Sequence, residues 1–600
     1  MSEEFFNWQM TCDRFAQEGD VRGMRACAAE VRALTVPGAP AEADAMEAEA
    51  ALYAGDAETA ERYARAAVAK DAHHFRGNLA LAGALGAQFK LIEELPLLAA
   101  LTHELETALL PGRANAAGMT EEKDQEAWAR HLRQFLFRAR GFEADAAYLA
   151  ADPGRAAEAL RHASALAPDI GTAANLYSKH LFMKNYRMQV PKQKRLDAEM
   201  FGEFFQGIQP YRHDQVRRLP EKRLRIGYLS RDFRLHAMAY FMMPFLRDFD
   251  PEHFAVYVYA SGAVDDVTRR FQRCHVQWRD FRGRSAHTAA RIIGEDQIDI
   301  LVDLSGHSQD NALPVMAFHP APITLTGLGY VATTGLHAID GVLVDGVTMP
   351  AGADEEAFVE RPVHLPSLFC YQPGAVREMP PVSGWSPYAR NNYVTFGSFN
   401  NLAKLTDETL LCWRAILDRV PRSRLVFKGK MLSVPDGRQL FTERLQALQF
   451  PIERIELRPF SERYLEEYAD IDIALDPSPY TGGLTTCEAL YMGVPVVTLR
   501  GRTHGSRFGA SILTAAGLPE LIAENEMEYV KIAVALARHP EHLALNRQRL
   551  RTHLEASRLM DAKGYMKGVE GVYRKLWHAF CDKGDRWAMK KSGSIIFPVG

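Results

Sequence analysis

Apolar positions follow a helical spacing over about the first 215 residues. In 57–68 and 155–168, Ala and Leu recur among Glu and Arg at helical intervals, and each stretch follows a short turn of Gly, Asp or Pro. Paired helices with small residues at their crossings are typical of helical-repeat arrays. The pattern therefore predicts an α-helical, TPR-like repeat domain over 1–215, with a plain helical bundle as the open alternative.

The pattern changes at Leu224, where short apolar runs begin to alternate with helical stretches. We expect strands at 224–229, 254–259 and 298–304, and a helix near 286–294. Apolar runs divided by helices of about 10–15 residues are the pattern of a parallel sheet. A first α/β domain is therefore predicted over 222–378, and Pro and Gly residues at its end mark a linker.

A second α/β pattern follows over 388–600. Its predicted strands are 393–399, 424–428, 471–476 and 495–499, and a helix is predicted at 486–492. The fold class is then a helical domain followed by two doubly wound, Rossmann-like domains. Domains of this kind bind ligands at the carboxyl ends of their strands, in the cleft where two of them face each other.

Composition narrows the class of protein. The 600 residues are 47% hydrophobic and 24% charged, which is typical of a soluble globular protein, and the net charge of −4 gives no reason to expect nucleic acid as a partner. Seven scattered cysteines without a Cys-x-x-Cys pair argue against a disulfide framework and a cysteine zinc site. Because neither a signal sequence nor a run of 18–20 apolar residues is seen, we expect a cytoplasmic protein with no membrane insertion.

The stretch 476–490 is the most informative motif. It follows an apolar run and opens a predicted helix, and Gly482 and Gly483 allow a ligand to approach the main chain. Thr485 and Thr486 stand at the helix N-terminus, where free N–H groups and hydroxyls favour a phosphate. Glu488 could accept hydrogen bonds from a ribose. An ordinary capped helix is the equally weighted alternative.

Two further candidates follow predicted strands. Lys404 comes after Phe399-Asn400-Asn401 and could neutralise a leaving diphosphate, the charge that develops in glycosyl transfer. A solvated lysine is the commoner fate of any single lysine. His236 follows the first strand of the first α/β domain and could act as an acid or base or hold substrate. With 20 histidines in the chain, a structural or surface role is the alternative.

Glycines and threonines in 303–307 and 327–335 suit close approach of a ligand at strand ends, although plain turns explain each segment alone. Asp470-Ile471-Asp472 matches the Asp-x-Asp pattern that often holds a divalent metal. It enters its strand from the amino end, whereas ligands of such sheets lie at the carboxyl ends, so we predict no metal there.

Taken together these segments resemble glycosyltransferase family 41. That family includes protein O-GlcNAc transferases, SPINDLY-type O-fucosyltransferases and bacterial adhesin-modifying N-glucosyltransferases. The resemblance covers about 222–580 and rests on these ordered segments: Ser230–His236, Asp303–His307, Pro320–Ile323, Leu328–Tyr330, Phe399–Lys404, Thr485–Leu490 and Ser506-Arg507.

The resemblance implies a GT-B fold, inversion at the anomeric carbon, and catalysis without a metal or other cofactor. It also implies a set of site residues: Lys404 at the diphosphate, Asn401 beside the nucleotide, Thr485 and Thr486 on phosphate, Glu488 on the ribose, His236 as the cleft histidine, and Leu328 and Gly329 along the sugar.

Several positions depart from the family pattern. Val331 and Ala332 replace the usual Pro-Gly near the donor sugar, and Leu484 stands where animal O-GlcNAc transferases carry a histidine near the base. The resemblance implies a UDP-sugar donor, UDP-GlcNAc or UDP-glucose, and transfer to a protein side chain, Ser or Thr. The helical domain would bind the acceptor protein. The alternatives are transfer to Asn and a catalytically inactive repeat-scaffold binding protein.

Overall fold

The computed structural model describes residues 3–111, 113 and 122–583. The chain divides into two compact units, of which the first is Met1–Met183 with Met431–Arg444 and the second Lys184–Lys430 with Leu445–Gly600. In the described part, no helix has both the length and the apolar character needed to cross a membrane.

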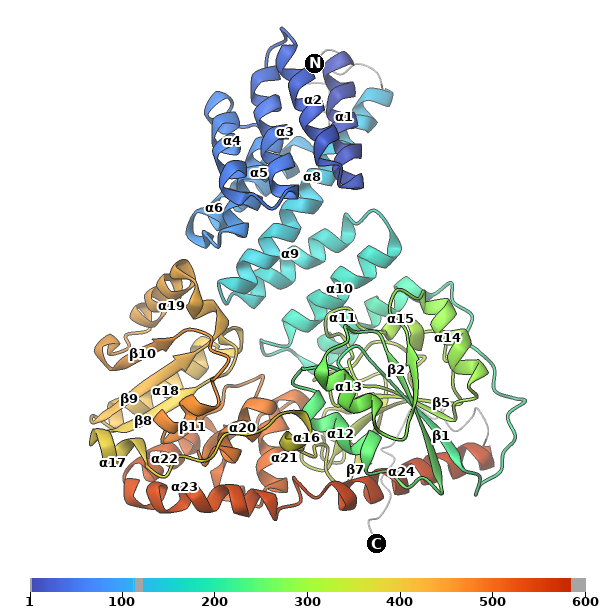
Figure 1. Cartoon of the computed structure of the whole chain (residues 1–600), viewed down its shortest axis with the longest axis vertical. Coiled ribbons are helices and arrows are strands. Elements are labelled where there is room, and N and C mark those ends of the chain that lie inside the picture. The colour runs from blue at the N-terminus through green and yellow to red at the C-terminus, as the bar shows by residue number, and fades with distance from the viewer. Residues whose placement is uncertain (1–2, 112, 114–121, 584–600) are drawn as a thin grey trace. The chain divides into compact units, whose positions relative to one another are not determined.

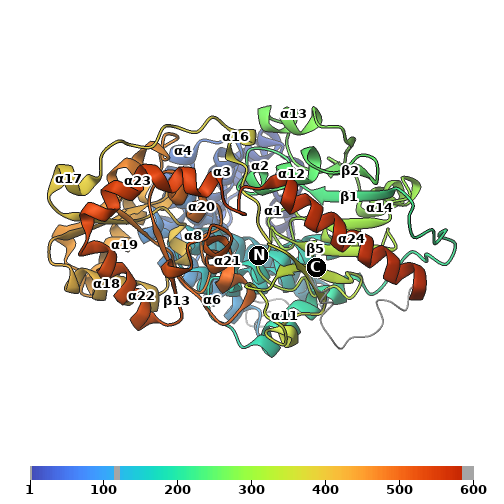
Figure 2. The same ribbon diagram turned by 90° about the horizontal axis from the view of Figure 1, so that it is seen from below.

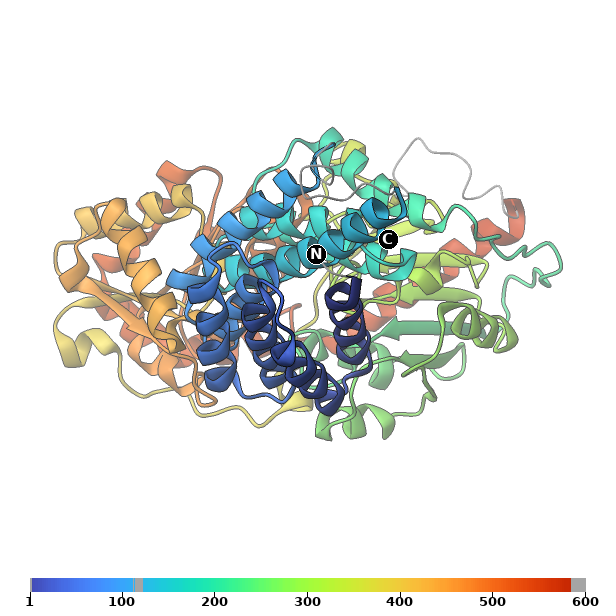
Figure 3. The same cartoon turned by 90° about the horizontal axis from the view of Figure 1, so that it is seen from above.

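The first unit consists of helices that pack against their neighbours in sequence. Figure 3 shows α1 to α5 beside one another. Asp20, Asp56 and Asp152 each cap a helix by accepting a backbone N–H three residues ahead. The predicted helical-repeat region is confirmed. Its helices are α1 (Glu3–Glu18), α2 (Val21–Ala33), α3 (Ala39–Tyr53), α4 (Ala57–Lys70), α5 (Phe75–Ala87), α6 (Leu91–Ala108), α8 (Glu122–Leu149), α9 (Pro153–Ala165) and α10 (Ile170–Lys184).

The second unit opens with a parallel sheet of seven strands in the order β3-β2-β1-β4-β5-β6-β7 (Figure 1, green). Its central strands are buried over most of their length, so their sequences read as continuous apolar runs. The strands are β1 (Leu224–Ser230), β2 (Phe254–Ala260), β3 (Gln277–Asp280), β4 (Ile300–Asp303), β5 (Ile323–Gly327), β6 (Gly341–Asp345) and β7 (Arg361–Leu365).

A second parallel sheet has six strands in the order β10-β9-β8-β11-β12-β13 (Figure 1, yellow to orange). In both sheets the order of the strands reverses next to the first strand, between β1 and β4 and between β8 and β11. Doubly wound sheets bind ligands at such a topological switch point. The predicted α/β architecture is confirmed. The strands are β8 (Val394–Ser398), β9 (Ser423–Lys428), β10 (Ile455–Arg458), β11 (Ile473–Leu475), β12 (Val496–Leu499) and β13 (Ile522–Ala523).

Helices cover both sheets. Around the first sheet they are α11 (Pro191–Gly202), α12 (Ala239–Arg247), α13 (Asp266–Gln272), α14 (Ala286–Glu295), α15 (Leu313–Met316) and α16 (Pro373–Val376). The later helices are α17 (Pro387–Asn391), α18 (Asp407–Arg419), α20 (Leu484–Tyr491), α21 (Phe508–Ala515), α22 (Glu526–Ala537), α23 (Pro540–Glu555) and α24 (Ala562–Lys583). Helix α19 (Pro435–Ala447) lies mostly in the first unit.

Besides Met431–Arg444, two further segments lie elsewhere than the predicted domain boundaries suggest. Helix α24, within the predicted third domain, packs on the first sheet, where the Trp577 indole N–H donates to the Leu219 carbonyl (2.9 Å) (Figure 2, red). Residues 184–205, within the predicted helical domain, belong to the second unit. In both cases an amphipathic helix buries its apolar face on an α/β domain, which a boundary drawn from composition does not reveal.

Candidate functional site

Lys404 lies at the switch point of the second sheet. It ends a short 3₁₀ helix, Leu402–Lys404, that follows β8. Its half-buried ammonium donates to the Thr481 carbonyl (2.9 Å) and stands 4.4 Å from the ring centroid of Tyr480. Burial lowers the pKa of Lys404 to about 8, although the Asp476 carboxylate nearby acts in the opposite direction. Lys404 thus carries a positive charge that is held mainly by uncharged groups.

Asp476 shapes the loop that faces Lys404. The buried carboxylate directly follows β11 and accepts hydrogen bonds from the Gly482 N–H (2.6 Å) and the Thr498 hydroxyl (2.6 Å). Burial raises its pKa to about 6. A Cβ on Gly482 would lie 2.5 Å from the Thr486 Oγ1 and 2.7 Å from the Thr485 Oγ1, so the loop closes tightly over the start of α20. The sequence motif included Asp476, but its part in holding the loop was missed.

The predicted phosphate site is at the N-terminus of α20. The Thr485 hydroxyl donates to the Asn400 side-chain oxygen (2.9 Å), which connects the end of β8 to the helix. Thr486 is buried beside it. Asn401, the amide expected beside the nucleotide, is exposed, and its side chain accepts from the Ala403 N–H (3.1 Å). Asn400, which the sequence did not single out, is the amide in contact with the helix.

Glu488 is buried one turn further into α20. The Tyr464 hydroxyl donates to it (2.5 Å), and burial raises the pKa of Glu488 to about 8 even though Tyr464 and Arg377 favour the charged form. Its carboxyl group is therefore largely neutral at pH 7. Tyr464 was not found from the sequence because it lies on a separate segment, brought to Glu488 by folding.

His236 lies in the loop after β1, at the switch point of the first sheet. Its Nδ1 accepts the Met238 N–H (3.3 Å), and the Asp232 carboxylate is 3.5 Å from the same nitrogen. Burial and two nearby arginines lower its pKa, while Asp232 acts to raise it. In the neutral ring with Nδ1 as acceptor, the proton is on Nε2, which is then a donor.

The loops after β4 and β5 pack directly on each other. Leu328 adopts a left-handed backbone (φ 69°), and a Cβ on Gly329 would overlap the Leu304 carbonyl oxygen. The buried Asp303 accepts from the Gly306 N–H (2.9 Å) and the Thr326 hydroxyl (2.8 Å), as Asp476 does in the second sheet. Both domains therefore fix the turn beside the switch point with an aspartate and a threonine from the next strand.

A connecting segment bridges these loops within the second unit. The Asn185 amide donates to the Tyr330 hydroxyl (2.9 Å), next to the predicted sugar loop, and the ring of Tyr186 stacks on that of Tyr480 at 5.2 Å. The two α/β domains also touch directly, since a Cβ on Gly505 would lie 2.6 Å from the Val331 Cβ. The structure thus brings the candidates of both domains to facing edges. No pattern in the sequence pointed to Asn185 or Tyr186.

The Asp-x-Asp pair lies at the other end of the second sheet. Asp472 precedes β11 and accepts from the Thr395 N–H (2.8 Å) and the Ser386 hydroxyl (2.9 Å), and Asp470 pairs with Arg390 (2.8 Å) and Arg458 (3.0 Å). These carboxylates hold the amino edge of the sheet together, away from the switch point.

Two facing, doubly wound domains after a helical-repeat region have the architecture of the GT-B fold. The family model of glycosyl transferase family 41 matches residues 204–379 and 375–569, and the chain belongs to that family.

Known proteins resemble the chain over different parts of its length. The probable UDP-N-acetylglucosamine–peptide N-acetylglucosaminyltransferase SPINDLY of Solanum lycopersicum is 38% identical over 419 residues, 68% of this chain and 45% of that protein. Its Arabidopsis thaliana counterpart is 40% identical over 375 residues, 61% and 40% of the two chains. The chain thus spans less than half the length of these curated relatives.

A solved structure covers more of the chain. A mutant of the Thermobaculum terrenum O-GlcNAc transferase superposes with a TM-score of 0.71 at 28% identity, over 92% of this chain and 99% of that one. The likeness therefore includes the helical region as well as the two α/β domains.

Proposed function

We propose that the chain transfers a single sugar from UDP-GlcNAc or UDP-glucose to Ser or Thr side chains of proteins. The observation that carries the proposal is the edge between β8 and β11, where the ammonium of Lys404 faces the loop leading into α20. In the described part of the chain, Lys404 has no carboxylate within ion-pair distance and contacts a carbonyl and an aromatic ring. The relatives are named as probable UDP-N-acetylglucosamine–peptide N-acetylglucosaminyltransferases, which supports the donor and acceptor classes.

The chemistry follows from this arrangement. The acceptor hydroxyl attacks the anomeric carbon while the bond to the diphosphate breaks. The electron pair of that bond moves onto the phosphate oxygen, and the hydroxyl proton leaves with the diphosphate. Lys404 and the N–H groups at the start of α20 stabilise the negative charge of the diphosphate, as a divalent metal ion does in other enzymes. A single displacement inverts the anomeric carbon.

His236 has a positioning role in this scheme. Because its Nδ1 accepts the Met238 N–H, the neutral ring offers an N–H from Nε2 and no lone pair there to remove a proton. We assign it to orienting a substrate oxygen. The Glu488 carboxyl, largely neutral and bonded to Tyr464, remains the proposed ribose contact.

The helical unit is proposed to bind the acceptor protein. Stacked helices present an extended surface of the kind that repeat proteins use for partners. The donor contacts proposed here all come from residues beyond 229, so donor binding and acceptor binding would be separate properties of the chain.

The test is a donor panel. The full chain is incubated with candidate acceptor proteins and UDP-GlcNAc, UDP-glucose or GDP-fucose, and intact masses are measured. We expect the mass of one sugar to be added from a UDP-sugar. Transfer from GDP-fucose alone would overturn the donor assignment, and absence of both UDP binding and turnover of any donor would overturn the function.

A further inference from the structure

The sugar loop, residues 328–335, follows β5 at the carboxyl edge of the first sheet. Its Val331 lines the same narrow hollow as Tyr480, whose ring centroid lies 4.4 Å from the Lys404 ammonium. In a sugar nucleotide the sugar is bonded directly to the diphosphate. A donor whose diphosphate lies at Lys404 therefore carries its sugar next to the sugar loop.

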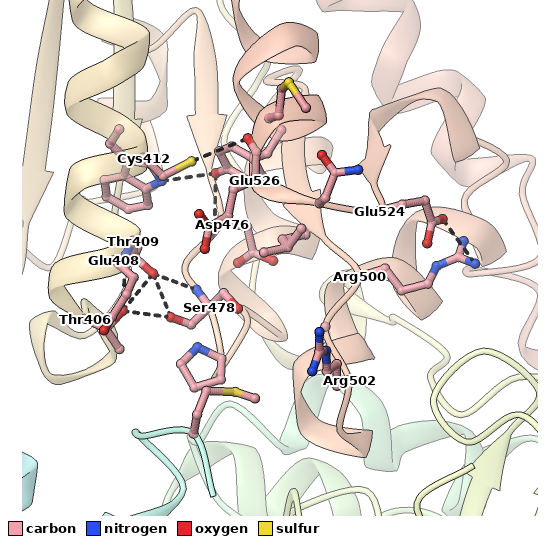
Figure 4. Close-up of a pocket in the computed structure, with 18 of the residues that line it drawn as sticks. Thr406, Glu408, Thr409, Cys412, Asp476, Ser478, Arg500, Arg502, Glu524 and Glu526 are labelled. Atoms are coloured by element: carbon pink, nitrogen blue, oxygen red, sulfur yellow. Dashed lines mark hydrogen bonds and ion pairs between the residues drawn. The ribbon is translucent and has the colours of Figure 1, made fainter. Parts of the chain in front are cut away.

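The donor loop, residues 476–483, is held from both sides within the second α/β domain. On its far side, the hydroxyl of Thr409 on α18 donates to the Ser478 carbonyl (2.6 Å) (Figure 4). On its near side, Lys404 donates to the Thr481 carbonyl (2.9 Å). The place of the diphosphate is thus set by the second domain, whereas the fit around the sugar depends on how the first domain holds the sugar loop.

Glu360 holds the sugar loop. It directly precedes β7 and is 3% exposed. Its carboxylate accepts the Thr334 N–H (2.7 Å) and the Thr333 hydroxyl (2.6 Å), and the Thr334 hydroxyl donates to it as well. Among the described residues, no basic side chain lies within ion-pair distance of Glu360. The hydrogen bonds of this buried carboxylate therefore go to the loop.

The two threonines extend this constraint along the loop. The Thr333 hydroxyl oxygen accepts the N–H groups of Gly335 (3.2 Å) and Val359 (3.2 Å), and the Thr334 carbonyl accepts from Nε2 of His307 (2.8 Å). Burial lowers the pKa of His307 to about 4, so the ring is neutral at pH 7 and donates its Nε2 proton there. Because the loop contains no proline to fix a backbone angle, its shape depends on these bonds.

We propose that Glu360 is a positioning residue that fixes the sugar loop and so determines how well the chain binds the sugar of its donor. It makes no contact with the donor itself and acts through Thr333 and Thr334 on the residues from Leu328 to Val331. The inference rests on the proposed function, because it takes this loop to line the donor sugar.

Calorimetry on the full chain tests this role through the contribution of the sugar. Dissociation constants are measured for UDP-GlcNAc, UDP-glucose and UDP, and the ratio of a sugar nucleotide to UDP reports the sugar alone. We expect Glu360→Ala to weaken binding of the sugar nucleotide at least fivefold relative to UDP. The affinity for UDP should stay within twofold, since the donor loop belongs to the other domain. An unchanged ratio in the folded variant would overturn the proposal.

Two variants separate positioning from a general loss of stability. Glu360→Gln fills the same space and keeps an oxygen for both Thr334 donors, so its ratio should change less than threefold. Asp340→Ala is the matched control, because Asp340 accepts the N–H (2.8 Å) and hydroxyl (3.0 Å) of Thr324 in the same way at the amino end of the same sheet. It should leave the ratio unaltered. Equal changes in the Asp340→Ala and Glu360→Ala chains would reduce Glu360 to a structural role and overturn the proposal.

Circular dichroism first checks that each variant is folded. Thr333→Val removes one hydrogen bond to Glu360 with little change in volume, and it provides the same test where Glu360→Ala does not fold. We expect it to weaken binding of the sugar nucleotide at least twofold relative to UDP. No change in this variant would also contradict the proposal.

The positioning role and the proposed function can fail separately. Loss of the sugar contribution in Glu360→Ala, in a chain whose wild type transfers no sugar, would retain the role and reject the transferase. Transfer by the wild type with an unaltered ratio in Glu360→Ala would retain the transferase and reject the role. If the chain binds GDP-fucose instead, the UDP donor is rejected and the role is measured as GDP-fucose against GDP. A wild type that binds none of these nucleotides would overturn both.

Discussion

At the residue scale, burial sets the charge of the two ionisable groups proposed to meet the donor. Lys404 stays protonated up to a pH of about 8, and Glu488 stays protonated up to a similar pH. At pH 7 the site therefore presents one positive charge and a neutral carboxyl group. A diphosphate meets an ammonium without a competing carboxylate from Glu488.

Removing the ammonium is expected to abolish most transfer. Lys404→Ala should lose about 2.7–4 kcal/mol of barrier lowering, a factor of about 10²–10³ in turnover, because a single charge stabiliser in a closed site has that effect. Lys567→Ala, an exposed lysine on α24, is the matched control. Turnover is measured by intact mass, and circular dichroism checks the fold. Wild-type turnover in a folded Lys404→Ala variant would contradict the assignment of Lys404 to the diphosphate.

The lowered pKa of Lys404 predicts a pH limit. Because the ammonium is lost as pH rises through about 8, kcat/KM for the donor should fall towards a tenfold loss per pH unit above that value. Lys404→Arg keeps its charge at high pH, so any activity it retains should stay flat from pH 7.5 to 9.5. An identical decline in both proteins would assign the limit to another group.

Glu488 should leave a signature in stability. Its folded pKa, about 8, lies above its ordinary value of 4.5, so its favourable contribution is complete below pH 4.5 and is lost as pH rises through 8. Glu488→Gln cannot ionise, and its Tm relative to the wild type should therefore increase between pH 5 and 8. Asp303 and Asp476 are present in both proteins and cancel in the difference. A difference that is constant with pH would contradict a neutral Glu488.

At the element scale, the loop from β11 into α20 depends on close packing at Gly482. Gly482→Ala would push a Cβ against the hydroxyls of Thr485 and Thr486, so we expect UDP affinity to fall at least tenfold. Gly429→Ala is the matched control, since this glycine follows β9 at the same edge and its Cβ would meet Leu402 only at an ordinary 3.5 Å. Calorimetry with UDP measures both. Equal affinities would show that the loop does not shape the donor site.

The strands that the sequence predicted are buried ones, although β5 and β6, which are buried throughout, were not predicted. β1 and β2 begin at the predicted Leu224 and Phe254, because a strand buried on both faces is a continuous apolar run. β3 (Gln277–Asp280) was missed because this edge strand is mostly polar and half-exposed. The start of α20 could be placed because a glycine pair and two threonines follow a strand. The sequence could not place Asn185, Tyr186 and Tyr464 at the site, since only tertiary packing brings these separate segments there.

At the scale of the whole molecule, the position where the first unit ends determines which truncated chains keep the contacts of the connecting segment. A boundary near residue 215 or 200 would remove α11 and the connecting segment, which belong to the second unit. Phe201 packs edge-on against His307 at 4.5 Å, and Gly335 leaves no room for a Cβ beside the Ala198 carbonyl. Together with Tyr186 on Tyr480, these contacts support the loops of both α/β domains.

Two truncations should therefore behave differently. A chain of residues 184–600 keeps these contacts, so we expect it to bind UDP with the affinity of the full chain while its transfer to protein acceptors falls at least tenfold. A chain of residues 203–600 should lose UDP affinity as well, because Tyr480 and Tyr330 lose the partners that hold them. Calorimetry and intact-mass assays are compared only for fragments that circular dichroism shows to be folded.

If the folded 184–600 chain modifies proteins as well as the full chain does, the helical unit does not recruit acceptors. If the 203–600 chain binds UDP normally, the connecting segment does not support the donor loop.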